Sequence, residues 1–125
     1  MTVSAGPAAF ALTNAITDGD VSAALEALSR TLTIRGAEFK ALGQLAWHLR
    51  RALRARQLLD AGTPINQAIP QMPAGPKKAF AGMLRRRSTE ALRSDFRRLI
   101  RCDLAMKSGA KPKSAMKELV VALCT

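Results

Sequence analysis

The side chains best suited to chemistry in this sequence are arginines at helical spacing. Arg93, Arg97 and Arg101 recur at every fourth position, so in a helix they form one stripe, which Arg98 widens. Such a stripe could follow the phosphates of a nucleic acid or pair with acidic side chains of another subunit. A solvated helix face is the ordinary alternative. Because few acids lie nearby to neutralise the stripe, both interpretations stay open.

A second group of arginines surrounds the single tryptophan. At about 100° per residue, one side of a helix carries Trp47, Arg51, Arg54 and Leu58, and another side carries Leu42, Leu45, Leu49 and Leu53. The favoured interpretation is that another helix covers Trp47, because large aromatic side chains are usually mostly buried. The alternative is an anchor in a protein interface, where Trp and Arg are enriched. The candidate residues for an interface or a DNA contact are therefore Trp47, Arg50, Arg51, Arg54, Arg93, Arg97 and Arg101.

One carboxylate occupies an unusual position. Helical spacing places Asp103 between Leu99 and Met106, toward the middle of an apolar face. A carboxylate there needs a partner, because burying an unpaired charge is costly. Lys107, one turn later, falls toward the same face and is one possible partner for the carboxylate. A backbone N–H or an arginine such as Arg50 is another. We therefore expect a structural polar network at Asp103 and Lys107.

The sequence lacks the residue sets that catalysis or metal binding requires. It has one histidine and no tyrosine, and it contains neither a phosphate-binding glycine loop nor a nucleophile motif. His48 has no acid or thiol on its own helical turn, so we expect a surface imidazole. Cys102 and Cys124 lie too far apart for a metal or redox motif and are expected to be reduced thiols. No catalytic residue, metal or cofactor is predicted, and the chain is not expected to be an enzyme.

The elements that must position these residues are helices throughout. The apolar spacing predicts an all-α fold, a single bundle of about five to six helices, because no segment alternates like a strand. We expect a flexible lead over residues 1–8 and one domain over 9–125, with a Pro/Gly-rich loop at 62–76 that holds at most one helical turn. The predicted helix boundaries are Asp20 as an N-cap, Gly36, Gly62 and Gly109 as stops, Ser88 as an N-cap and Pro112 near a helix start.

The charge of the 125-residue chain is large and uneven. Twenty Lys and Arg oppose nine Asp and Glu, which gives a net charge of +11. Residues 40–125 carry 18 of these bases and five acids, a net charge of +13, whereas residues 1–39 are slightly acidic. A polyanion or an acidic protein is the expected partner. The sequence has no apolar run long enough to span a membrane and no signal-peptide start, so we expect a cytoplasmic protein with no membrane contact.

Several motifs together resemble the C-terminal domain of the bacterial DNA polymerase III delta subunit. The long helix offers Leu45-Ala46-x-x-Leu49-Arg50-x-x-Leu53, with Leu49 where the family has an aromatic residue. Arg86-Arg87-Ser88-x-x-x-Leu92 resembles the family's next segment, with Arg87 where an aromatic is usual. The other matching segments are Phe10-x-Leu12-Thr13-x-Ala15-Ile16, Gly19-Asp20, Ala24-Leu25-x-x-Leu28, Gly36-x-Glu38 and Leu99-x-x-x-Asp103-Leu104-Ala105-Met106-Lys107-Ser108-Gly109.

The resemblance implies a place in the clamp loader, the pentamer that opens the sliding clamp and sets it on primed DNA. In that family the C-terminal domains form a helical collar that joins the subunits, and delta itself does not hydrolyse ATP. Delta contacts the sliding clamp through a separate N-terminal domain, so the chain resembles an excised collar domain or a truncated relative. The expected partners are the other clamp-loader subunits, with DNA possible through the basic face and a nucleoid-associated location. The alternative is a stand-alone basic helical domain that binds nucleic acid.

Overall fold

The computed structural model describes residues 7–125, and within them the chain forms seven helices and no strand. The all-α prediction is confirmed. The helix count exceeds the expected five to six because a single turn at residues 65–68 counts as a helix. Residues 1–6 of the predicted lead lie outside the described residues, and 7 and 8 belong to the first helix. The helices are α1 (Pro7–Asp18), α2 (Val21–Thr31), α3 (Ala37–Asp60), α4 (Ile65–Ala68), α5 (Ala74–Arg86), α6 (Thr89–Lys107) and α7 (Pro112–Cys124).

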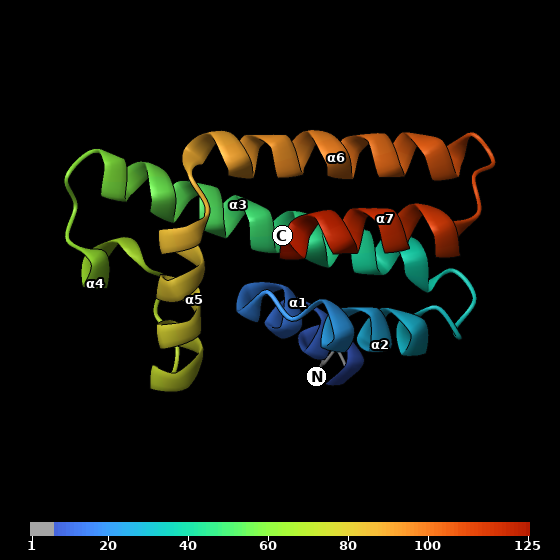
Figure 1. Cartoon of the computed structure of the whole chain (residues 1–125), viewed down its shortest axis with the longest axis horizontal. Helices are drawn as coiled ribbons and strands as arrows, with labels where there is room; N and C mark the ends of the chain where they lie inside the picture. Colours follow the sequence, from blue (N-terminus) through green and yellow to red (C-terminus); the bar gives the residue numbers. More distant parts are fainter. Residues whose placement is uncertain (1–6) are drawn as a thin grey trace.

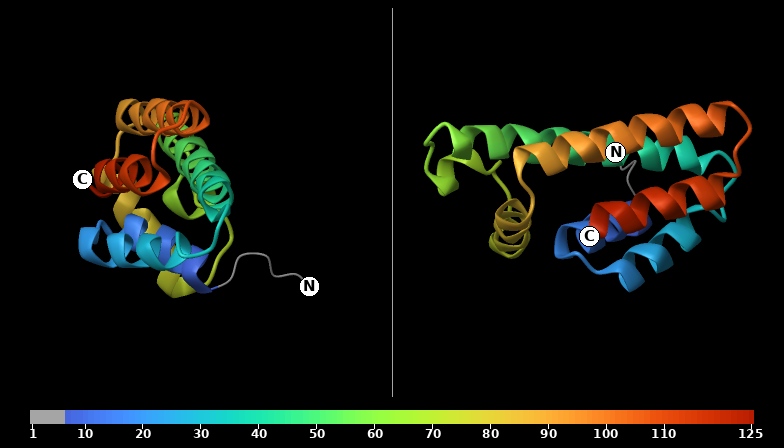
Figure 2. Two further views of the ribbon diagram at one scale, coloured as in Figure 1. Left: turned by 90° about the vertical axis from the view of Figure 1, so that its right-hand side faces the viewer. Right: turned by 45° about the horizontal axis from the view of Figure 1, so that its top comes forward.

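The helices fall into a long bundle and a crossing helix. α3 and α6 run side by side in opposite directions, α7 lies beside α6, and the α1–α2 hairpin covers the far side of the bundle (Figure 1). Seen end-on, α6, α7, α3 and the hairpin surround one core (Figure 2). α5 crosses this direction and packs against α1 and α3. The crossing leaves grooves between α1 and α5.

Short side chains cap the helices where the sequence predicts. Asp20 accepts a hydrogen bond from the N–H of Ala23, and Ser88 accepts one from the N–H of Ala91. These bonds satisfy amide groups that have no partner inside the helix. Gly109 ends α6 with a φ of 103°, a conformation that glycine adopts without strain. These boundaries place the turns that orient α2, α6 and α7.

Two boundaries differ from the prediction. α2 ends at Thr31 instead of continuing to Gly36, and the Thr33 hydroxyl donates to the Arg30 carbonyl at 2.7 Å. This bond satisfies a carbonyl at the helix end and favours a turn. α5 begins at Ala74, inside the predicted loop. Pro76 is tolerated there because the first amides of a helix have no intrahelical acceptor.

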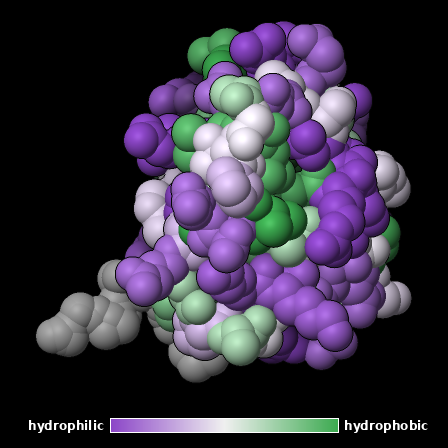
Figure 3. Space-filling model, turned by 90° about the vertical axis from the view of Figure 1, so that its left-hand side faces the viewer, coloured by the Kyte–Doolittle hydropathy of each residue, from purple (hydrophilic) through white to green (hydrophobic). Residues whose placement is uncertain are grey.

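The core cluster is made mainly of leucines, methionines and alanines from six of the helices, and the single turn α4 adds the buried Ala68. Ala24, Ala27, Ala52 and Ala55 are at most 1% exposed, so these small side chains allow the helices to pack closely. Hydrophilic side chains cover most of the end of the molecule that carries α4 and α5, with hydrophobic groups gathered near its centre (Figure 3). This end of the molecule is therefore polar apart from a local apolar area.

A buried ion pair fixes the corner between α5 and α6. Asp95 is 1% exposed, and its Oδ1 accepts a hydrogen bond from Arg87 Nη2 at 2.5 Å. Arg98 lies 3.4 Å from the same oxygen. Burial raises the pKa of Asp95, and hydrogen bonding and charge from Arg87 and Arg98 act in the opposite direction. Arg87 thus ties the connection between α5 and α6 to α6.

Candidate functional site

The structure places Trp47 at a groove, not in the core. Its side chain is 51% exposed, so the favoured prediction of internal packing is wrong. The Arg51 guanidinium lies 4.3 Å from the centre of the indole ring and 5.8 Å from that of Phe80. Burial lowers the pKa of Arg51. The partly desolvated guanidinium stabilises the indole orientation through a cation–π contact.

The groove beside Trp47 is bounded by α1, α3 and the start of α5 and has a volume of about 520 Å³. Phe10 of α1 lines it and is 58% exposed, a second exposed aromatic ring. Sequence reasoning did not name Phe10 among the candidate contact residues. Helical spacing along α1 does not show which of its apolar side chains a neighbouring helix covers.

His48 lies behind Trp47 and is 5% exposed, so the prediction of a surface imidazole is wrong. Its Nε2 is 3.5 Å from the Thr17 hydroxyl, and its ring packs edge-on against Phe80. Burial, and then the charge of Arg51, lowers the pKa of His48 to about 4. His48 is therefore a neutral core residue at neutral pH.

The remaining arginine candidates lie on exposed surfaces of α3 and α6. Arg50 and Arg54 are exposed on α3, and neither forms an ion pair within the described part of the chain. Arg93 lies 3.5 Å from Glu90, and Arg97 donates to the Ser94 hydroxyl at 2.9 Å. Arg101 is exposed. The candidates thus fall in three places. Trp47 and Arg51 line the groove, Arg50 and Arg54 lie elsewhere on the surface of α3, and the other three lie on the surface of α6.

Two apolar side chains lie within the α6 arginine stripe. Ile100 is 53% exposed and Leu104 is 58% exposed, and their four-residue spacing puts them on one outward face with Arg97. Sequence reasoning missed them, although the same helical spacing that groups the arginines also groups these two. We call Ile100, Leu104, Arg97 and Arg101 the α6 outer face.

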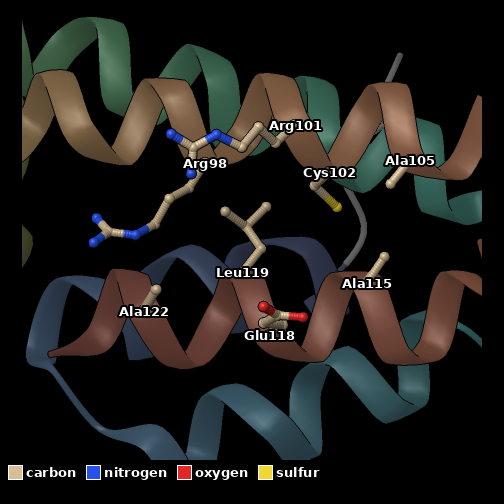
Figure 4. Close-up of a pocket in the computed structure, with 8 residues that line it drawn as sticks. All are labelled: Arg98, Arg101, Cys102, Ala105, Ala115, Glu118, Leu119 and Ala122. Carbon is tan, nitrogen blue, oxygen red and sulfur yellow. The ribbon is translucent and has the colours of Figure 1, made fainter.

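A groove of about 300 Å³ runs between α6 and α7 next to this face. Figure 4 shows Cys102 and Leu119 between the two helices, with Arg98 and Arg101 extending from α6 over one end and Glu118 projecting from α7. The other lining residues are three alanines, which present little side-chain bulk. The groove can receive side chains of a partner beside two guanidinium groups.

Asp103 and Lys107 form a pair at the edge of the buried face of α6. Lys107 Nζ lies 2.9 Å from Asp103 Oδ2, and the Asp103 side chain is 28% exposed. Asp103 is therefore not in the middle of the apolar face, where the sequence placed it. The buried carboxylate of α6 is Asp95, eight residues earlier.

Among residues 7–125, no three metal-binding side chains cluster, and no helix is long and apolar enough to cross a membrane.

A family model described as DNA polymerase III delta subunit, C-terminal domain, matches residues 7–124. The chain belongs to this family. The predicted resemblance is thereby confirmed, and the chain is a delta-type clamp-loader domain of the replication machinery. The family is that of a clamp-loader subunit domain and not of a catalytic polymerase subunit. A comparison with curated proteins finds no match.

Proposed function

We propose that this delta C-terminal domain joins a clamp loader by packing the α6 outer face against the helical domain of a neighbouring subunit. The observation that carries the proposal is the exposure of Ile100 and Leu104 inside an arginine stripe. Exposed apolar side chains rimmed by polar ones are typical of protein interfaces, in which arginine is also enriched. The adjoining α6–α7 groove extends this surface.

This role makes the domain an assembly element that supports loading of the sliding clamp onto primed DNA. Apolar contact through Ile100 and Leu104 would supply affinity, while Arg97 and Arg101 would select an acidic partner surface. The contact with the sliding clamp itself is assigned to a delta N-terminal domain and to none of these residues.

The test is a pair of charge substitutions on the outer face. The variant Ile100→Asp with Leu104→Asp is mixed with the other subunits of the clamp loader, and association is followed by size-exclusion chromatography. We expect at least about a tenfold loss of affinity, because two carboxylates would replace apolar groups at the contact. Thermal unfolding should change little, since both positions are exposed.

Ile34→Asp is the control, because Ile34 is 67% exposed in the turn after α2 and lines a groove with Pro112 and Lys113 of α7 but with no residue of α6. It should assemble like the unchanged chain. Equal assembly of all three proteins would refute the proposed face, and loss of assembly in the Ile34 variant alone would move the interface to the α2–α3 turn.

A further inference from the structure

Gly43 lies inside α3 at a position where the fold itself does not need a glycine. Its φ is not positive, and a Cβ added there would meet nothing within 4 Å apart from its chain neighbours and its own helix backbone. Glycine inside a helix is destabilising relative to alanine, because it loses more backbone freedom on folding. What glycine does permit at an exposed position is close approach of another molecule to the helix backbone.

Two exposed aromatic side chains flank this glycine. Phe39, one turn before Gly43, is 42% exposed, and Trp47, one turn after it, is 51% exposed. Their four-residue spacing puts all three residues on one face of α3. The bare backbone at Gly43 therefore lies between two aromatic rings, and we call these three residues the α3 notch. Exposed Trp and Phe side chains are enriched where proteins contact one another.

The charge on this face of α3 is positive. Lys40 follows Phe39, and Arg50 and Arg54 continue the line of the notch toward the end of the helix. All three basic side chains are exposed, and none forms an ion pair within residues 7–125. α3 contains no Asp or Glu from position 39 to position 59. Charge complementarity therefore favours an acidic partner.

We propose that the α3 notch docks an acidic amphipathic helix of a partner protein, with one of its apolar side chains between Phe39 and Trp47. The partner's carboxylates pair with Lys40, Arg50 and Arg54. A helix fits this surface because its apolar side chains recur every three to four residues, the spacing of the two rings, and because the glycine lets the two backbones come close. The inference goes beyond the assembly role, which is placed on α6, and does not depend on it.

The probe is a synthetic helical peptide with leucines along one face and glutamates along the other, labelled at one end. Fluorescence anisotropy follows its binding to the whole chain. It should bind at low salt and more weakly at high salt, because salt screens the charge pairs. A peptide with lysines in place of the glutamates should not bind. Binding should also change the emission of Trp47, the one Trp of a chain without Tyr.

Substitutions at the glycine separate a docking role from a structural one. Gly43→Leu fills the notch and should weaken peptide binding at least about fivefold, as loss of an interface contact does. Gly43→Ala should raise the midpoint of thermal unfolding by about 3–5 °C, because the position is open and alanine favours the helix. A glycine required by the fold would give the opposite change in stability.

Variants at the basic residues test the charge pairing. Arg50→Ala with Arg54→Ala should weaken peptide binding and reduce its dependence on salt, because two of the proposed charge pairs are lost. Lys111→Ala with Lys113→Ala is the matched control, since it removes the same charge at the start of α7. The control should bind the peptide nearly as well as the unchanged chain does.

Three results would overturn the proposal. The first is no binding of the glutamate peptide, or equal affinity of Gly43→Leu and the unchanged chain. The second is loss of peptide binding in Ile100→Asp with Leu104→Asp but not in Gly43→Leu, which would place the peptide on the α6 outer face. The third is an effect of Gly43→Leu on binding of an oligothymidylate but not of the peptide, which would assign the notch to a nucleic acid. The test of subunit assembly is separate, because it measures association with the other clamp-loader subunits.

Discussion

The two halves of α6 use the same residue types in opposite ways. In the first half, Asp95 is buried and bonded to Arg87, and it fixes the corner between α5 and α6. In the second half, Asp103 and Lys107 pair at the surface, beside the exposed Ile100 and Leu104. The difference shows that one helix can fix a corner through a buried carboxylate in its N-terminal half and present an exposed contact face in its C-terminal half. Burial of each carboxylate decides which role it has.

The largest expected effect comes from breaking the buried pair. Arg87→Met would leave Asp95 buried with only the longer contact to Arg98, and we expect a loss of about 3–5 kcal/mol in the free energy of unfolding. Chemical denaturation measures it. The double variant Arg87→Met with Asp95→Leu should lose much less, because it removes both charges together. Equal losses in the single and double variants would mean that the pair does not hold the corner.

A second buried polar group extends the comparison from α6 to α3. The pKa of His48 is lowered to about 4 in the fold, against about 6.5 in an unfolded chain. The unfolded chain therefore binds a proton first as the pH falls, and the fold loses stability between about pH 6.5 and 4. This loss amounts to about 3 kcal/mol at most. The loss of stability disappears above pH 6.5, where the His48 ring is neutral in both the folded and the unfolded chain.

The measurement is the unfolding free energy at several pH values for the unchanged chain and for His48→Leu. The variant should have a flatter pH dependence in this window, because leucine does not titrate. Asp60 does not obscure the result. Hydrogen bonds from Thr89 and Arg56 lower its pKa, so its contribution to the pH dependence of the unfolding free energy lies at more acidic pH. Identical slopes for the two proteins would show that His48 is accessible to protons in the fold.

A smaller effect is expected where α6 begins. Ser88→Ala removes the acceptor for the Ala91 N–H, and we expect a loss of about 1 kcal/mol. Asp20→Ala is the matched variant at the start of α2, where the same kind of bond is 3.0 Å long. Thermal unfolding of both should give similar losses. A much larger loss at Ser88 would indicate that the cap also supports the adjacent Arg87–Asp95 corner.

Helical spacing predicted the fold well and the surfaces less well, for a physical reason. The caps at Asp20 and Ser88 are local interactions between neighbours in the sequence, so the sequence contains them. The exposure of Trp47 and the burial of His48 depend on where α5 crosses α3. That crossing is set by long-range packing and by the Arg87–Asp95 pair, and the periodicity of α3 contains neither. Helical spacing therefore places residues on faces but does not decide which neighbour covers each face.

The smallest expected effect completes the contrast between the two carboxylates. Asp103→Asn keeps the size of the side chain and removes only its charge, and we expect a loss within about 0.5 kcal/mol, as for exposed pairs one turn apart in a helix. Chemical denaturation at low and moderate salt measures it, and the loss should shrink as salt screens the pair. Lys107→Ala, which removes the other partner, should behave alike because that side chain is 60% exposed. A loss comparable to that of Arg87→Met would instead show that Asp103 is buried in solution. It would also remove the distinction between a half of α6 with a buried carboxylate and a half with a partly exposed one.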